Sequence, residues 1–397
     1  MTEALIGPPV SRSRKAIAFS TAAAEGRFAL QVCLNCNQVT YPPREVCPDC
    51  WSMELEWRDI PDGGELLTET TLRTSFNNYF RERMPWRIGT IKLDVGPTVL
   101  AHVHGDVAAY GRVKMIARTD KSGQGVLMAL PEMETENMAD DRQLRELTCD
   151  PKSRRVLVSD GRTELGQCMA KALVEAGAAT VFLGITEDGR PDEGKDDLAK
   201  VPGVELMPLD ITDTSSVNGL AGEIGGKTDI LINTAECIRP GSTMERSGIE
   251  TARDEMETNY FGLMRLIQAF GPHMRARGVD DDACAWVNLL SVYALSNWPV
   301  YGTSSASQAA AYSLSQCLRG EFAGSGVKVI NVLFGPLEES GRQLTPQQLA
   351  DTVVHALRQG IENVNLGPVA EDVVRRFKED PFLLERELSQ VRSGQSI

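Results

Sequence analysis

Four cysteines in two closely spaced pairs are the clearest chemical signal in this chain. Cys33 and Cys36 form one Cys-x-x-Cys pair, and Cys47 and Cys50 form a second pair after a spacer of ten residues. Two such pairs can place four thiolates tetrahedrally around one zinc ion. Iron in the same ligand set and four ordinary buried cysteines are the alternatives. Paired knuckles favour a closed structural site over a redox-active dithiol, so the sequence predicts structural zinc.

Composition limits the classes of partner and the number of domains. A chain of 397 residues suggests two or three domains. The net charge of -14 argues against nucleic acid and anionic membrane as partners, since both need a basic face. No apolar run reaches the eighteen residues of a transmembrane helix, and the N-terminal segment lacks the apolar stretch of a signal peptide. A cytoplasmic location is therefore expected.

The chain divides into two halves with different secondary-structure patterns. Residues up to about 131 alternate in short segments between Gly-rich turns, which predicts an all-β half. Residues 132–153 are acidic and poor in β-branched residues, so we expect a linker. From residue 154 to residue 397 strands and helices alternate, which implies a parallel, doubly wound α/β sheet followed by C-terminal helices. The expected strands of this half are 155–158, 180–183, 205–209, 229–232, 285–288 and 327–331.

The first half resembles the acyl-CoA-associated OB-fold family, which carries a rubredoxin-like zinc ribbon after an N-terminal helix. The resemblance covers residues 12–131 and rests on the cysteine pairs, on Pro42-Pro43-Arg44 and on the strand motif of residues 91–97, in that order. It implies an N-terminal helix and zinc ribbon in residues 1–60 and an OB-fold barrel in residues 61–131. Members of that family accompany thiolases, thiolase-like aldolases and hydroxymethylglutaryl-CoA synthases. The resemblance thus implies acyl-CoA chemistry and a thiolase-like partner.

A basic and aromatic cluster lies within the expected barrel. Arg81, Arg83 and Arg87 stand beside Phe80 and Trp86. Guanidinium groups bind phosphate well, so contact with the phosphates of CoA is one interpretation. A solvated loop is the other.

Two histidines, His102 and His104, lie two residues apart on an expected strand. Side chains at this spacing share one face of a strand. Since no cluster of cysteines or carboxylates lies nearby, we expect a half-exposed sheet face rather than a metal site.

Residues 288–310 resemble the catalytic segment of the short-chain dehydrogenases/reductases, and the resemblance extends over residues 154–370. Ser291 takes the place of the family's catalytic serine. Thirteen residues later Ser304 stands where the family has tyrosine, and Gln308 stands where it has lysine. The family's proton transfer needs a phenol whose pKa is lowered by a neighbouring ammonium. A serine beside a neutral amide cannot perform this step near pH 7, so no catalytic residue is expected here.

The dinucleotide turn of that family is altered as well. Its Thr-Gly-x-x-x-Gly-Ile-Gly pattern corresponds to residues 159–166, in which Gly166 remains but Asp160 and Glu164 replace the other two glycines. Those glycines let the backbone approach the pyrophosphate. A like-charge contact at 4 Å costs on the order of 4 kcal/mol at an effective dielectric constant near 20. Binding of NAD(P) is therefore not expected.

Four further positions match the family pattern. Asp210 corresponds to an aspartate that contacts adenine, and Asn233 opens the altered Asn-Asn-Ala-Gly segment. Asn259 and Ser291 correspond to the family's helix asparagine and catalytic serine. We interpret all four as vestigial positions that now serve the structure.

The two halves together suggest a non-catalytic subunit of an acyl-CoA-processing complex. Its OB and zinc-ribbon half would dock a thiolase-like enzyme, and its Rossmann half would pair with an active short-chain dehydrogenase. This arrangement would couple 3-hydroxyacyl-CoA oxidation to thiolytic cleavage. The alternatives are an NAD(P)-dependent 3-hydroxyacyl-CoA dehydrogenase with a rearranged active site, and a homo-oligomeric acyl-CoA-binding or regulatory protein.

Overall fold

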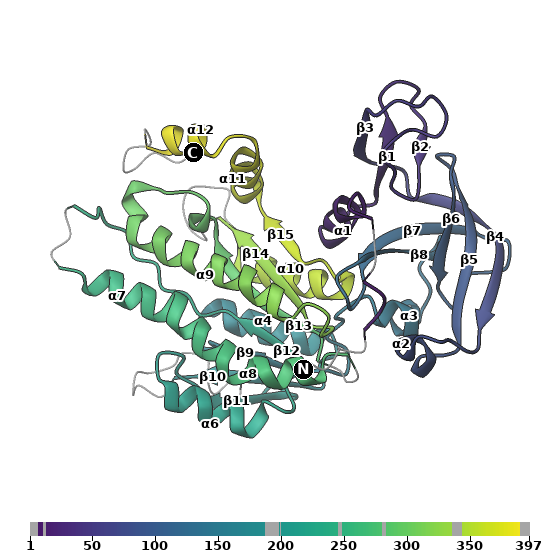
Figure 1. Ribbon diagram of the computed structural model, residues 1–397. Helices are drawn as coiled ribbons and strands as arrows, with labels where there is room; N and C mark the ends of the chain where they lie inside the picture. Colours follow the sequence, from purple (N-terminus) through teal and green to yellow (C-terminus); the bar gives the residue numbers. More distant parts are fainter. Residues whose placement is uncertain are drawn as a thin grey trace. The chain divides into compact units, whose positions relative to one another are not determined.

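The computed structural model describes residues 7–10, 13–186, 198, 200–244, 248–279, 283–335 and 344–389. Two compact units divide the chain (Figure 1). The first holds residues 1–150 with the short segments 323–326 and 357–362, and the second holds residues 151–322, 327–356 and 363–397. Within the described residues, no helix has both the length and the apolar character needed to span a bilayer.

The first unit begins with a helix and a small sheet. Helix α1 (Ala16–Ala24) precedes strands β1 (Ala29–Cys33), β2 (Val39–Thr40) and β3 (Leu55–Asp59). The strands are antiparallel in the order β2-β1-β3. All five residues of the central strand β1 are buried, and Cys33 is its last residue. The first cysteine pair therefore begins at the end of the central strand.

A closed five-stranded barrel follows, as expected. Its elements are β4 (Gly63–Leu72), α2 (Asn78–Glu82), β5 (Trp86–Leu93), β6 (Thr98–Val103), β7 (Arg112–Thr119) and β8 (Gly125–Pro131). The strands close in the order β4-β5-β6-β8-β7. Aliphatic side chains such as Leu66, Ile91 and Met115 fill the interior. Gly89 is needed where β5 crosses this core, because a Cβ there would lie 2.6 Å from Leu66 Cδ1. Two short turns follow the barrel, η1 (Met138–Asp140) and α3 (Arg142–Arg145).

The second unit is a seven-stranded sheet in the order β11-β10-β9-β12-β13-β14-β15, and every pairing in it is parallel. This is the doubly wound order of dinucleotide-binding folds, as expected. Its strands are β9 (Arg155–Val158), β10 (Thr180–Ile185), β11 (Val204–Pro208), β12 (Ile230–Asn233), β13 (Ala285–Ser291), β14 (Lys328–Phe334) and β15 (Asn363–Leu366). The central strands are nearly continuous runs of apolar residues, and both of their faces are buried.

Helices connect these strands and cover the sheet (Figure 1). They are α4 (Glu164–Glu175), α6 (Thr214–Ile224), α7 (Glu250–Met256), the π-helical segment η2 (Glu257–Gly262), α8 (Leu263–Arg277), the short turns η3 (Val292–Ala294) and η4 (Pro299–Tyr301), α9 (Gly302–Glu321), α10 (Pro346–Gln359), α11 (Pro368–Glu379) and α12 (Pro381–Leu388). Helices α7, η2 and α8 all pack against α9. Trp286 and Phe270 are among the large side chains buried between the sheet and these helices.

Candidate functional sites

The four cysteines converge on one point of the zinc ribbon. Their sulfur atoms all lie within 4.8 Å of one another. Cys33 Sγ is 3.5 Å from Cys50 Sγ, and Cys36 Sγ is 3.6 Å from Cys47 Sγ. A tetrahedral set with Zn–S bonds near 2.3 Å separates its sulfurs by about 3.8 Å. The donor set thus has the chemistry and the spacing of a zinc-ribbon site.

The two knuckles share one backbone design. In the first, the amide of Asn37 donates to Cys33 O over 2.9 Å, and in the second the amide of Trp51 donates to Cys47 O over 3.1 Å. Both turns place the residue after the second cysteine in the left-handed region, with φ of 59° at Asn37 and 63° at Trp51. Asparagine tolerates this region, whereas a bulky side chain there is an outlier.

Ser304 and Gln308, at the positions of the resembled family's tyrosine and lysine, are buried and bonded within the protein. Ser304 Oγ donates to Glu255 Oε1 over 2.6 Å. Gln308 Oε1 accepts from the amide of Ser291 over 3.1 Å, and Gln308 Nε2 donates to Glu236 Oε1 over 3.4 Å. Ser304 is fully buried and Gln308 is 2% exposed. The two side chains therefore serve as internal links between α9 and its neighbours.

Glu255 is a buried carboxylate that the sequence does not reveal. It is fully buried on α7, and its Oε1 atom also accepts the amide of Arg239 over 3.0 Å. Its Oε2 atom has no hydrogen-bond partner among the described residues. The guanidinium of Arg239 pairs with Asp254 at 2.7 Å instead. Glu255 thus places an acidic group against Ser304, at the position where the family has its phenol.

The two retained family positions near the catalytic pair are structural links. Asn259, in the π-helical segment, accepts from the amide of Cys237 and donates to its carbonyl, over 2.8 and 2.7 Å. Asn259 also donates to Ser307 Oγ over 2.8 Å, which ties η2 to α9. Ser291 Oγ accepts from the amide of Tyr293 over 3.3 Å and so begins the turn η3. Both residues satisfy backbone groups of their own chain.

The altered dinucleotide turn joins β9 to α4. Thr163 caps α4 by accepting from the amide of Gly166 over 3.1 Å, which engages one of the free amides at this helix terminus. Asp160 Oδ1 accepts from the amide of Arg162 over 3.0 Å. Glu164 is exposed in the first turn of the helix. A Cβ at Gly166 would lie 1.9 Å from Asp160 O, so the one remaining glycine is required by packing.

Polar side chains of the neighbouring strands surround this turn. Asn233 Oδ1 accepts from Ser159 Oγ over 2.9 Å. Asp210 Oδ1 accepts from both the amide and the hydroxyl of Thr212, over 2.8 and 2.7 Å. Glu236 follows β12, and burial raises the pKa of its carboxyl group to about 7. Asp160, Glu164 and Glu236 thus bring three carboxyl groups to the segments that bind the dinucleotide in the resembled family.

The three candidate arginines of the barrel lie in different environments. Arg81 is exposed and donates to Asn78 Oδ1 over 2.6 Å. Arg83 is buried, lies 4.0 Å from the centroid of the Tyr79 ring, and pairs with Glu146 at 3.0 Å. Burial would raise the pKa of Glu146, but Lys121 and Arg83 hold it below the usual value. Of the three, therefore, Arg81 alone presents its guanidinium to solvent.

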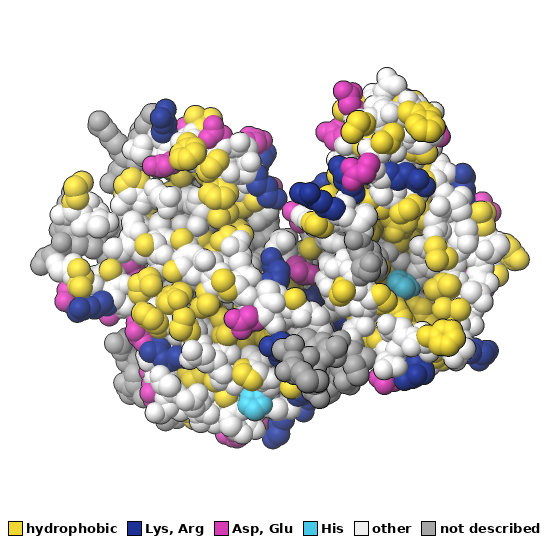
Figure 2. All heavy atoms as spheres, viewed as in Figure 1, with side chains coloured by type: hydrophobic (Ala, Val, Ile, Leu, Met, Phe, Trp, Pro, Cys, Tyr) yellow, Lys and Arg dark blue, Asp and Glu magenta, His cyan; other side chains and the backbone are white. Residues whose placement is uncertain are grey.

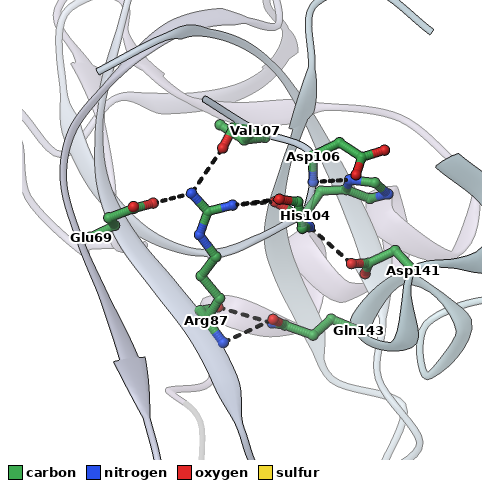
Figure 3. Close-up of polar contacts among 8 residues, drawn as sticks. Glu69, Arg87, His104, Asp106, Val107, Asp141 and Gln143 are labelled. Atoms are coloured by element: carbon green, nitrogen blue, oxygen red, sulfur yellow. Dashed lines mark hydrogen bonds and ion pairs between the residues drawn. The ribbon is translucent and has the colours of Figure 1, made fainter. Parts of the chain in front are cut away.

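Arg87 holds a loop of the barrel together (Figure 3). Its guanidinium donates to the carbonyl oxygens of His104, Gly105 and Val107, over 2.8 to 3.0 Å, and pairs with Glu69. A planar guanidinium with five donors suits such a set of acceptors. This use of Arg87 is structural.

The segment after the barrel is bonded to the same loop (Figure 3). Gln143 accepts from the amide of Arg87 over 2.8 Å and donates to its carbonyl over 2.9 Å. Asp141 accepts from the amide of Gly105 over 2.9 Å. Residues 141–143 thus continue the first unit beyond its last strand.

The expectation of a half-exposed sheet face at His102 and His104 is wrong for His104, whereas His102 is partly exposed. His104 is 1% exposed, and one of its ring nitrogens is 2.9 Å from Met138 O. His102 Nδ1 accepts from Trp86 Nε1 over 2.8 Å. Burial lowers the pKa of His102 to about 4, and the indole donor requires the neutral ring. Alternation along the strand could not reveal the aromatic and loop residues that cover this face.

Comparison with known proteins gives the same division of the chain. Residues 20–56 match the rubredoxin-like zinc ribbon domain of ChsH2, residues 57–115 match its C-terminal OB-fold domain, and residues 154–348 match the short chain dehydrogenase family. Each of these models covers less than half of the chain, and together they describe regions similar to a zinc ribbon, an OB-fold and a Rossmann-type domain, in that order. The chain thus joins ChsH2-like domains to a region similar to the short-chain dehydrogenases, and the two resemblances seen in the sequence are confirmed.

Individual relatives match the second half. An uncharacterized oxidoreductase of Mycobacterium tuberculosis is 29% identical over 246 residues, which are 56% of this chain and 70% of that protein. A fatty acyl-CoA reductase of Acinetobacter baylyi is 25% identical over 222 residues, 52% of this chain and 73% of that protein.

Solved structures also match. A short chain dehydrogenase of Burkholderia cenocepacia, in complex with NADP, is 28% identical with a TM-score of 0.54, covering 60% of this chain and 98% of that one. A short-chain dehydrogenase of Streptomyces avermitilis is 25% identical with a TM-score of 0.50, covering 57% of this chain and 93% of that one.

Proposed function

We propose that this chain is a non-catalytic accessory subunit of an acyl-CoA-processing complex. Its OB and zinc-ribbon half docks a thiolase-like enzyme, and its dehydrogenase-like half pairs with an active short-chain dehydrogenase. The complex oxidises a 3-hydroxyacyl-CoA and cleaves the resulting 3-oxoacyl-CoA by thiolysis. The domain combination supports the acyl-CoA context, because ChsH2-type domains are joined here to a dehydrogenase domain.

One observation carries the non-catalytic assignment. Ser304 and Gln308 replace the phenol and the ammonium, and both are bonded to protein groups. A catalytic hydroxyl must reach the reacting oxygen of the substrate at about 2.6–3.2 Å. Ser304 Oγ donates instead to the buried carboxylate of Glu255. This hydroxyl is therefore already engaged in a bond within the protein.

We infer further that NAD(P) binds weakly or not at all. The residues present do not fit a pyrophosphate: a hydroxyl cap engages one amide at the start of α4, and carboxyl side chains occupy two former glycine positions. Glu236 adds a third carboxyl group. Relatives with NADP bound keep the general fold, but the fold alone does not supply the glycine turn.

The helices α7 to α9 offer a surface for the dehydrogenase partner. The outward side of α9 carries small exposed residues, namely Ala306, Ser313, Cys317 and Gly320. Small side chains let a second helix approach closely. Phe261, next to this face on η2, is 42% exposed. Figure 2 shows hydrophobic side chains gathered over α8 and α9. This face supports pairing through helix–helix contacts.

The test is reconstitution of the complex from the full chain. The thiolase-like protein and the complete short-chain dehydrogenase of the same host are co-expressed with it, and the complex is isolated by size-exclusion chromatography with mass determination. We expect all three chains to co-elute. A chain that remains a homo-oligomer in the presence of both would contradict the proposal and favour the regulatory alternative.

A dehydrogenase with a rearranged active site is the second candidate. Tyr293 and Tyr301 stack with ring centroids 4.5 Å apart, and Tyr301 is the residue that precedes α9. A phenol is therefore present three residues before Ser304. Hydride transfer to NAD or NADP by the isolated chain, lost in Tyr301→Phe, would support this candidate and overturn the non-catalytic assignment.

A further inference from the structure

The second zinc knuckle carries an unusual residue at its tightest point. Trp51 has a φ of 63° and is 81% exposed. The turn is imposed by the cysteine pair, since the amide of Cys47 donates to Ser52 O over 2.9 Å while the amide of Trp51 donates to Cys47 O. A bulky residue in the left-handed region is strained, and backbone strain of this kind is concentrated at functional sites.

The first knuckle provides an internal comparison. It has the same pair of backbone bonds, from Asn37 to Cys33 O and from Cys33 to Gln38 O. Its left-handed position is held by Asn37, which is the residue type that the turn accepts with little strain. The metal site therefore does not require a tryptophan at this position. Packing in a core does not explain the tryptophan either, because its side chain is exposed.

Trp51 belongs to an exposed apolar cluster, which we call the ribbon tip and define as Leu34, Trp51 and Met53. Leu34 is 47% exposed and Met53 is 77% exposed. The amide of Leu34 donates to Glu54 O over 2.9 Å, so the loops of the two knuckles lie side by side. Figure 2 shows hydrophobic side chains on the surface of the zinc ribbon, beyond β1 to β3. Tryptophan and methionine are enriched where proteins bind one another.

Charge at the ribbon tip points to the kind of partner. Asp49 and Glu54 flank Trp51 and Met53, and both are exposed. Neither carboxylate forms an ion pair with any described residue. A complementary surface would carry an apolar pocket rimmed by lysine or arginine. A second copy of this chain fits poorly, because its own tip is acidic and the net charge of the chain is -14.

We propose that the ribbon tip is the anchor by which this chain binds its thiolase-like partner, with Trp51 inserted in an apolar, basic-rimmed pocket. This inference rests on the proposed function, because it identifies the surface used by the docking step proposed above. The strained backbone at Trp51 is retained for the contact made by its side chain.

The experiment compares matched substitutions at the two left-handed positions of the full, zinc-loaded chain. Trp51→Gly relieves the strain and removes the side chain, while Asn37→Gly relieves strain in the other knuckle. Trp51→Asn introduces the residue type found in the first knuckle. It preserves the turn should glycine make the turn too flexible. Binding to the purified thiolase-like protein of the same host is measured by biolayer interferometry. Zinc content is measured on the same samples, together with the melting temperature.

We expect Trp51→Gly to keep its zinc, to melt at the same or a slightly higher temperature, and to bind at least about thirtyfold more weakly, as for a tryptophan hot spot. Trp51→Asn should lose binding likewise, and Asn37→Gly should bind like the wild type. Added salt should slow association of the wild type, because the rims are oppositely charged.

The other outcomes separate the two proposals. If the wild type binds and both Trp51 variants bind equally well, the tip is not the anchor, while the accessory function stands. If the wild type does not bind, the docking step and the anchor are both wrong. If the wild type is a homodimer and Trp51→Gly is a monomer, the ribbon tip binds a second copy of the chain instead.

Discussion

Recreating the family's catalytic pair is expected to damage the second unit without producing a dehydrogenase. The perturbation is Ser304→Tyr combined with Gln308→Lys, which places a phenol and an ammonium four residues apart on one face of α9. Ser304 is fully buried and its hydroxyl is bonded to Glu255, so a phenol ring must displace that carboxylate. The introduced ammonium would meet Glu236 but could not accept a hydrogen bond from Ser291.

The magnitude follows from these contacts. Inserting a ring into a closed core costs about 1–3 kcal/mol in strain. Leaving the buried amide of Ser291 without its acceptor costs roughly 1–3 kcal/mol more. Attraction between the introduced ammonium and Glu236 in the double variant offsets part of this, because it replaces the long amide contact of 3.4 Å that Gln308 makes. The free energy of unfolding should therefore fall by about 2–5 kcal/mol.

The assay has two readouts. Urea unfolding followed by circular dichroism reports the stability, and absorbance of the reduced nicotinamide reports hydride transfer with 3-hydroxyacyl-CoA substrates. The single variant Ser304→Ala serves as the control, since it adds no bulk. An unfolding free energy equal to that of the wild type, together with turnover, would refute the reasoning. Glycine substitutions at Asp160 and Glu164 should be needed before any turnover appears, because hydride transfer also requires a seated cofactor.

Three more predictions address the metal, the cofactor and a titrating side chain. Cys47→Ala should abolish zinc binding in elemental analysis and expose the ribbon to protease while the second unit stays folded, because structural zinc contributes roughly 10–16 kcal/mol in small peptides. NAD and NADP should show no micromolar binding in calorimetric titration of the wild type; such binding would show that the turn tolerates Asp160 and Glu164. His102 has its folded-state pKa lowered to about 4, so its stabilising contribution is complete above the unfolded value near 6.5 and is lost as the pH falls toward 4. In pH-dependent denaturation, the free energy of unfolding of His102→Gln should therefore fall less on acidification than that of the wild type. The difference is at most about 3 kcal/mol.

Periodic patterns made the fold predictable. The parallel, doubly wound sheet of the second unit followed from alternating apolar strands and helices, and the zinc ribbon followed from the spacing of its cysteines. These signals are local, since each depends on neighbours within one turn or one strand. The missing phenol and ammonium could be located for the same reason, because Ser304 stands at a fixed distance from Ser291 along the chain.

The groups that fill the former catalytic site could not be predicted in this way. Glu255 lies 49 residues from the serine it contacts, and nothing in its neighbours along the chain marks it as buried. The same limit affects the basic cluster of the barrel. Arg83 is recognisable as a cation, but its partner Glu146 lies 63 residues away in the acidic segment that composition alone suggests is a linker.

The π-helical segment around Asn259 bears on how this domain has changed. Asn259 bonds to both backbone groups of Cys237 and also to Ser307, so its loss would remove these two backbone contacts and the side-chain link between η2 and α9. Asp160, Glu164, Ser304 and Gln308, by contrast, stand where the family pattern has two glycines, a phenol and an ammonium. Under the proposed non-catalytic function, the domain separates two kinds of selection that coincide in an active enzyme. On that proposal, positions that hold the architecture persist, and positions that serve only the reaction are free to drift.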